Sequence, residues 1–415
     1  METLSELFIA ALAATTAFRI WLGTRQLRHV AAHRAGVPAA FAQHITLQQH
    51  QKAADYTSAR TRLALVELLV DAALTLLLTL GGGIDLLDRA LRGAAPPGIG
   101  HGLALVAAVA LIGGGVSLPF SIWRSFLIEA RFGFNRMTPK IFITDLVKSL
   151  QLAFAIGLPV VALVLWMMQA LGSLWWLWTW AFYMAFSLLM VVVYPTWIAP
   201  LFNQFTPLSD ESLRSRIEAL LARCGFESKG LYVMDGSKRS AHGNAYFTGL
   251  GRAKRIVFFD TLIERLQPAE VEAVLAHELG HFERRHISKR ILLSFVLSLA
   301  FLGLLGWLVD KDWFYAGLGV GTPSNGAALI LFFTALPAFT FVLQPISSLY
   351  SRKYEFEADE YAARQTLAAD LVSALVKLYQ DNAATLTPDP LYSAVYDSHP
   401  PAAIRIAHLE RLAVA

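Results

Sequence analysis

Long apolar runs alternate with charged segments along this chain of 415 residues. A run of about 18 or more apolar residues is long enough to cross a lipid bilayer as a helix. Seven such runs are predicted to span a membrane, at residues 4–23, 62–82, 101–120, 150–170, 173–193, 290–309 and 327–347. The first has Glu2 and Glu6 where a signal peptide would have basic residues, so we interpret it as an uncleaved anchor.

The loops between the runs differ in their content of Lys and Arg. The segments after the first, third and fifth runs are basic, whereas the other loops hold only a few cations, such as Arg89, Arg92 and Lys311, each close to Asp residues. Basic loops are retained in the cytoplasm. The pattern therefore predicts an external N-terminus and a cytoplasmic C-terminus, in agreement with seven spans.

Two polar regions, 194–289 and 348–415, are long enough to fold outside lipid, and both fall on the cytoplasmic side. The predicted organisation is a membrane region of five helices (1–193), a first polar part (194–289), two further membrane helices (290–347) and a second polar part (348–415). Within the polar parts we expect a helix at 209–225, with Ser209 as N-cap and Gly225 at its end, and strands at Leu231–Met234, Ala245–Thr248 and Ile256–Phe259. The expected fold is a mainly α, polytopic membrane protein with a small β-sheet.

Composition agrees with a membrane protein. The chain is 55% hydrophobic and only 16% charged, against roughly 25% charged residues in soluble domains. The net charge of +4 and the lack of a dense Lys and Arg run argue against nucleic-acid binding, and the single cysteine, Cys224, excludes an intramolecular disulfide. Arg outnumbers Lys and Ala is abundant, which indicates a GC-rich bacterial source and hence the bacterial inner membrane.

The motif His277-Glu278-Leu279-Gly280-His281 predicts a zinc-binding helix. Pro268 suits the first helical position, and Glu270 and Glu272 favour the positive end of the helix dipole. His277 and His281 stand one turn apart on one face, so both imidazoles can reach one ion. Glu278 projects beside them and can take a proton from the attacking water. The alternative is a chance match on a polar helix.

A catalytic zinc site needs a third protein ligand. The metzincin continuation is excluded because Arg284 and Ile287 stand where it requires Gly and His. His286 is predicted to point to a different face of the same helix. The third ligand should therefore come from a later segment.

Glu355 and Asp359 are the best candidates for this later segment. They lie one helical turn apart, so Glu355 can bind the metal while Asp359 hydrogen-bonds a ligand imidazole. Glu357 is predicted to fall on the opposite side. The alternative is a solvated acidic helix face.

Together these residues resemble the type I CAAX prenyl endopeptidases, membrane zinc proteases related to the bacterial heat-shock protease HtpX. The resemblance rests on the zinc motif, on Glu355–Asp359 and on the tail with His399, Pro400, Pro401 and Arg405. It extends to the segments 132–138, 194–203 and 244–246. It covers nearly the whole chain.

The resemblance implies seven helices around an internal water-filled chamber that a gluzincin-type domain caps. It implies zinc ligation by His277, His281 and Glu355, with one ion per chain, and Glu278 as general base. It further implies catalytic roles for Asp359, His399 and Arg405, and docking of a substrate strand along Asn244, Ala245 and Tyr246.

Each of the less certain positions also has a plainer interpretation. His399 could simply end a turn, Asn244 could be a turn residue and Arg405 a surface helix residue. Glu67 and Asp71 are carboxylates inside the second run, where they should face protein or water.

The leading hypothesis is a zinc metalloendopeptidase that cleaves a peptide or protein substrate, lipidated or membrane-associated, within the bilayer. An HtpX-like quality-control protease is the alternative within the same class. A non-catalytic seven-helix transporter or receptor is the alternative outside it, although such a scaffold would be expected to have lost Glu278 or Glu355.

Overall fold

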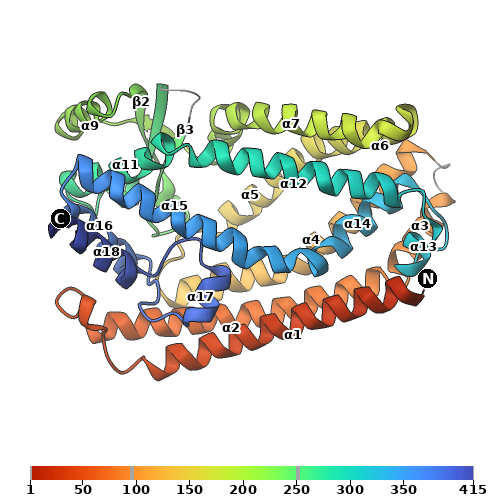
Figure 1. Ribbon diagram of the computed structural model, residues 1–415, viewed down its shortest axis with the longest axis horizontal. Helices are drawn as coiled ribbons and strands as arrows, with labels where there is room; N and C mark the ends of the chain where they lie inside the picture. The colour runs from red at the N-terminus through yellow and green to blue at the C-terminus, as the bar shows by residue number, and fades with distance from the viewer. Residues whose placement is uncertain (1, 94–97, 249–252, 415) are drawn as a thin grey trace.

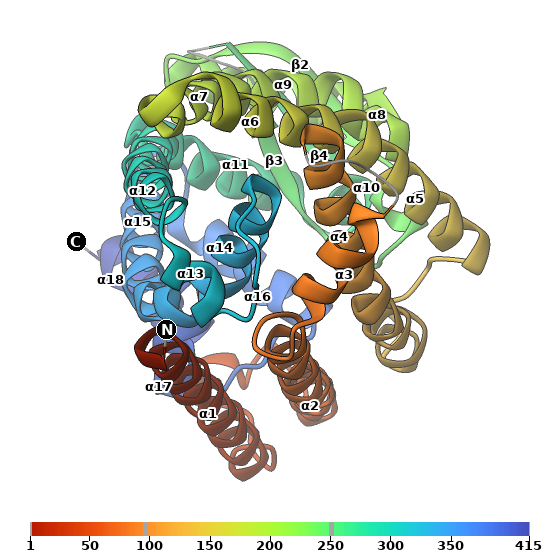
Figure 2. The same cartoon turned by 90° about the vertical axis from the view of Figure 1, so that its right-hand side faces the viewer.

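The computed structural model of the protein describes residues 2–93, 98–248 and 253–414. The apolar runs form long helices that lie side by side (Figure 1) and are arranged in a ring when viewed from one end (Figure 2). The helices of this region are α1 (Glu2–Ala32), α2 (Leu47–Leu78), α3 (Gly83–Arg92), α4 (Ile99–Ile122), α5 (Pro139–Leu152), α6 (Leu158–Ala170), α7 (Trp175–Val193), α12 (His286–Leu308), α13 (Asp312–Gly317) and α14 (Asn325–Thr340).

Within the described residues, six helical segments are long and apolar enough to span a membrane, or up to seven if α2 and α3 form one broken span. The pair is bent by 50°, next to Gly82, whose φ of +74° favours glycine. The predicted run 62–82 covers the second half of α2 and the break before α3, and the other six predicted runs lie on the six segments. Glu67 of α2 pairs with Arg124 at 2.7 Å, so an ion pair accounts for one of the two intramembrane carboxylates.

The two polar regions pack together at one end of the bundle (Figure 1). Their helices are α8 (Ala199–Phe202), α9 (Glu211–Arg223), α10 (Asp260–Ile263), α11 (Pro268–Glu283), α15 (Gln344–Gln365), α16 (Ala368–Asp381), α17 (Pro390–Tyr396) and α18 (Ala402–Val414). The predicted helix 209–225 is α9, but its N-cap is Asp210, whose carboxylate accepts the Leu213 N–H at 3.0 Å. The choice of Ser209 was therefore wrong by one residue.

A four-stranded sheet in the order β1-β2-β4-β3 lies beside these helices. The strands are β1 (Phe205–Pro207), β2 (Glu227–Met234), β3 (Ala245–Thr248) and β4 (Ala253–Phe259). β2 runs parallel to β4, and β1 and β3 are antiparallel to their neighbours. The three predicted strands are confirmed, whereas β1 was not predicted. β3 is an edge strand, so one side of its backbone pairs with no other strand among the described residues.

One hydrophobic core joins the sheet to helices from both polar regions. It includes Ile217 of α9, Phe258 of β4, Leu275 of α11 and Leu371 of α16. This core fixes α11 between the sheet and α16. The N-terminus lies at the opposite end of the molecule from this domain and the C-terminus lies within it (Figure 1).

Candidate active site

The helix α11 carries the His-Glu-Leu-Gly-His motif and begins at Pro268, as predicted. The Glu270 carboxylate accepts the Gln267 N–H at 2.7 Å, which closes the first turn. Glu270 also binds Ser373 and Lys377 of α16. Glu272 pairs with two arginines of α9. Glu270 and Glu272, which were expected only to favour the helix dipole, are therefore buried and connect α11 to neighbouring helices.

His277, His281 and Glu355 converge although Glu355 lies on a separate helix, α15. Their potential ligand atoms all lie within 4.8 Å of one another. Nε2 of His277 lies 3.4 Å from Glu355 Oε2, and Nε2 of His281 lies 3.4 Å from Oε1. The structure therefore brings the three predicted ligands together with their donor atoms facing a common point.

The donor set fits a metal ion. Two imidazoles and one carboxylate are the ligands of many catalytic zinc sites. Glu355 is 3% exposed, and its Oε2 atom has no hydrogen-bond donor among the described residues. A buried carboxylate oxygen without a donor is costly, and a bound cation would remove that cost.

Asp359 and Arg405 support the ligands from the buried side. Asp359 Oδ1 lies 2.8 Å from His277 Nδ1, and the Arg405 guanidinium donates to both Asp359 oxygens, at 2.9 and 2.5 Å. Burial and Arg405 lower the pKa of His277, but Asp359 and Glu355 outweigh them and raise it to about 9. With a pKa this high, His277 carries an extra proton at neutral pH that a metal ion must displace. Acid should therefore weaken metal binding. Arg405 is only 5% exposed and is not a surface residue.

Gly280, inside the motif, lets α11 approach α15 closely. A Cβ atom at this position would lie 2.9 Å from Ala358 Cα and 3.1 Å from its carbonyl oxygen. Such distances leave no room for a side chain. The small residue therefore sets the spacing that puts Glu355 and Asp359 against the two histidines.

His399 lies on the open side of the site. Glu278 follows His277 on α11 and is partly exposed. The His399 side chain is 61% exposed, and its Nε2 lies 3.5 Å from Glu355 Oε1. Both side chains are placed where a substrate could reach them.

The predicted docking residues Asn244, Ala245 and Tyr246 lie at the start of the edge strand β3. Asn244 is exposed, its side-chain oxygen accepts the Ala245 N–H at 2.9 Å, and its carbonyl accepts the Phe259 N–H. Phe247 packs edge-on against Phe282 of α11, with ring centroids 5.4 Å apart. This contact places the edge strand beside the C-terminal end of α11.

Sequence reasoning missed two residues, His286 and Glu357. His286 does not continue the helix of His281: α11 ends at Glu283, and His286 begins α12 after Arg285, which has a φ of 56°. His286 Nδ1 lies 2.9 Å from His281 Nδ1, and its Nε2 lies 2.9 Å from Glu357 Oε2. The prediction that His286 points to another face of the His281 helix was therefore wrong, because His286 belongs to α12 and contacts His281. Among the described residues, Glu357 reaches the site only through His286, which agrees with its predicted place on the side of α15 away from Glu355.

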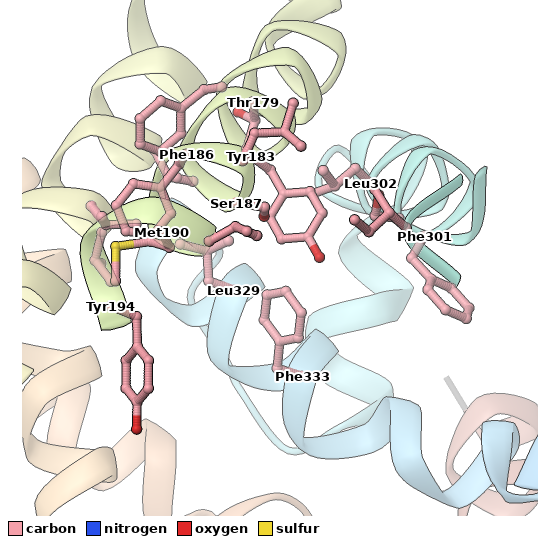
Figure 3. A pocket seen from close by; sticks show the side chains of 18 of the residues that line it. Thr179, Tyr183, Phe186, Ser187, Met190, Tyr194, Phe301, Leu302, Leu329 and Phe333 are labelled. Carbon is pink, nitrogen blue, oxygen red and sulfur yellow. The ribbon is translucent and has the colours of Figure 1, made fainter. Parts of the chain in front are cut away.

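An apolar chamber of about 1350 Å³ lies between the membrane helices and adjoins the site. Tyr183 of α7, Leu302 of α12 and Phe333 of α14 point into it (Figure 3). Tyr246 and Phe247 of β3 also line it. None of its described lining residues is charged. A chamber is therefore present among the membrane helices and its wall is apolar, whereas the expectation that water fills it stays a prediction.

Comparison with protein families gives two matches that together span most of the chain. The family described as CAAX prenyl protease N-terminal, five membrane helices, matches residues 26–204. Peptidase family M48 matches residues 207–413. The match to a peptidase family leaves the transporter or receptor alternative without support.

Individual proteins agree with these matches. The CAAX prenyl protease 1 homolog of Arabidopsis thaliana is 40% identical over 314 residues, which are 75% of this chain and 73% of that protein. CAAX prenyl protease 1 of Saccharomyces cerevisiae is 37% identical over 313 residues, 71% of this chain and 69% of that protein.

The crystal structure of Ste24p from S. mikatae superposes with a TM-score of 0.91 at 30% identity, over 98% of this chain and 99% of that one. Its agreement extends through both the membrane helices and the domain with the His-Glu-Leu-Gly-His helix. The chain thus belongs to the CAAX prenyl protease 1 family, and it is a multi-pass membrane metalloendopeptidase of the M48 type.

Proposed function

We propose that the protein binds one Zn²⁺ ion through His277, His281 and Glu355 and uses it to cleave lipidated proteins near their C-terminus. The convergence of these three donors around a buried carboxylate oxygen that accepts no hydrogen bond from the described residues carries the proposal. Bound zinc supplies a Lewis acid that activates water and polarises the scissile carbonyl.

The chain's own residues then have distinct tasks. Glu278 accepts a proton from the attacking water and later delivers it to the leaving amine. His399 donates a hydrogen bond to the developing oxyanion. Asp359 fixes the orientation of His277, and Arg405 neutralises Asp359 where both are buried.

The open edge of β3 receives the substrate backbone as an added strand. An extended peptide presents its carbonyls at regular spacing, so one of them can be placed over the metal. Tyr246 and Phe247 belong both to this strand and to the wall of the apolar chamber. A substrate paired with β3 can therefore extend a hydrophobic group into the chamber, which favours a prenylated CAAX tail over an unmodified one.

The proposed location is the bacterial inner membrane, with the metal-binding domain and C-terminus in the cytoplasm and the N-terminus outside. The unequal Lys and Arg content of alternate loops supports this orientation. Reporter fusions after Arg34 and after Lys254 should both report the cytoplasm, and one near Asp312 should report the outside. The reverse pattern would overturn the orientation.

The activity is tested with the purified protein in lipid nanodiscs. A farnesylated CAAX peptide should release its C-terminal tripeptide, detected by mass spectrometry, while the same peptide without the lipid should react more slowly. Glu278→Gln should trap bound peptide without cleaving it. Equal rates for both peptides would contradict the lipid preference, and no cleavage of either would contradict the CAAX substrate.

A further inference from the structure

His281 is supported by a chain of two side chains on the outer side of the metal site. Its Nδ1 lies 2.9 Å from His286 Nδ1, and His286 Nε2 lies 2.9 Å from Glu357 Oε2. His286 is 1% exposed, and its ring stacks on Tyr354, with centroids 4.1 Å apart and planes at 12°. The ring of His286 is therefore held in place both by stacking and by hydrogen bonds at its two nitrogens.

The break between α11 and α12 creates this arrangement. An uninterrupted helix would direct residue 286 away from residue 281. The left-handed conformation of Arg285, with φ 56° and ψ 32°, ends the helix and starts α12 at His286. Left-handed backbone is unfavourable for a residue other than glycine, Asn or Asp, so contacts elsewhere must hold it. The geometry is thus specific, since it requires an uncommon backbone conformation.

The number of protons on the two imidazole rings fixes the direction of the hydrogen bonds from His281 to His286 and from His286 to Glu357. Two Nδ1 atoms 2.9 Å apart share one proton between them. Ligation through Nε2 of His281, the atom that faces Glu355, leaves the proton on its Nδ1. His281 then donates to His286 Nδ1, which puts the proton of His286 on Nε2, and His286 donates to Glu357. One tautomer satisfies every member of the chain.

We propose that His286 and Glu357 are positioning residues that fix the tautomer and ring orientation of His281 toward the metal. This inference rests on the proposed metal site. Ligand histidines usually donate their second N–H directly to a carboxylate or carbonyl, as His277 does to Asp359 here. At His281 an imidazole is interposed, and the carboxylate at its far end, Glu357, is 27% exposed. The outer support is thus longer and more accessible to solvent than the inner one.

Two substitutions test the proposal. His286→Phe keeps a flat ring against Tyr354 but removes both nitrogens, and Glu357→Gln keeps an acceptor oxygen but removes the charge. Loss of an outer-shell partner typically reduces metal affinity about 10–100-fold. His286→Phe should show a reduction of that size, and Glu357→Gln a smaller one. The measurement is zinc affinity by chelator competition, together with the visible spectrum of the Co²⁺-substituted protein, which reports ligand geometry.

Glu360→Gln is the matched control because Glu360 also lies on α15 and, among the described residues, its carboxylate pairs with His408 alone, at 3.9 Å. It should retain the affinity and the spectrum. Unchanged affinity and an unchanged Co²⁺ spectrum in His286→Phe would overturn the proposal. If that variant does not fold, an unchanged Glu357→Gln overturns it instead. Glu355→Ala separates the two hypotheses: if it keeps its metal, the metal site itself is wrong.

Discussion

The metal centre and the apolar chamber adjoin each other but are built from opposite kinds of residues. In the metal centre, Asp359, Glu355 and Arg405 are 0%, 3% and 5% exposed, and each charge depends on another. The chamber has no charged residue in its described lining. Removing one partner from a buried charged network leaves the other charges uncompensated. A substitution in an apolar wall instead removes only part of the apolar contact area. Catalysis should therefore be sensitive to single substitutions in the metal centre, whereas binding of a lipid should tolerate single substitutions in the chamber wall.

The largest effect is expected from Glu355→Ala. This change removes one of the three proposed ligands, so the purified protein should lose its metal and its activity, as measured by metal analysis and peptide cleavage. Glu360→Ala on the same helix is the control and should retain both. If Glu355→Ala keeps full metal and activity while Glu357→Ala loses both, the assigned helix register is wrong.

Glu278→Gln separates metal binding from catalysis within the metal centre. The variant should keep stoichiometric metal but hydrolyse peptides at least about a hundredfold more slowly, because loss of a general base typically costs 10²–10⁴-fold. Turnover and metal content are measured on the same preparation. Near-normal turnover would reject Glu278 as the base.

His399→Ala should lower kcat about 10²–10³-fold, the usual effect of losing one donor to an oxyanion. KM should change little, and the metal should remain, because His399 lies at the open edge of the site and 61% of its side chain is exposed. Steady-state kinetics and metal analysis distinguish the possibilities. Loss of metal would instead assign His399 to the support of the ligands.

Asn244→Ala tests the edge strand β3, which adjoins both the metal centre and the apolar chamber. Its side chain orders the start of β3 by accepting the Ala245 N–H. Losing a hydrogen bond of about 1 kcal/mol should raise KM about fivefold, with kcat and metal content unchanged. A fall in kcat without a change in KM would contradict a role for Asn244 in backbone docking.

The smallest effect is expected from the chamber wall. Leu302→Ala removes apolar surface that faces the cavity (Figure 3). At about 0.8 kcal/mol for each buried methylene, KM for a farnesylated peptide should rise about fourfold or somewhat more, while KM for the unlipidated peptide stays constant. An equal rise for both peptides would show that the chamber does not recognise the lipid.

Local periodicity in the sequence predicted most of the helices and strands of this protein. Apolar runs located the membrane helices because a bilayer imposes a minimum length. Helical spacing placed His277 beside His281 and Glu355 beside Asp359, since residues one turn apart share a face. Alternation and β-branched residues located β2, β3 and β4. The family resemblance added His399, Arg405 and Asn244, which no local pattern would have singled out.

Only the tertiary structure decided how separate segments meet. Arg405 reaches Asp359 because α18 packs against α15, and the small Gly280 sets the distance between α11 and α15. The contact of His286 with His281 depends on one left-handed residue, Arg285. An arginine carries no sequence signal for such a conformation, because its own preference opposes it. The sequence determined which residues share a turn, whereas long-range packing determined which turns share a site.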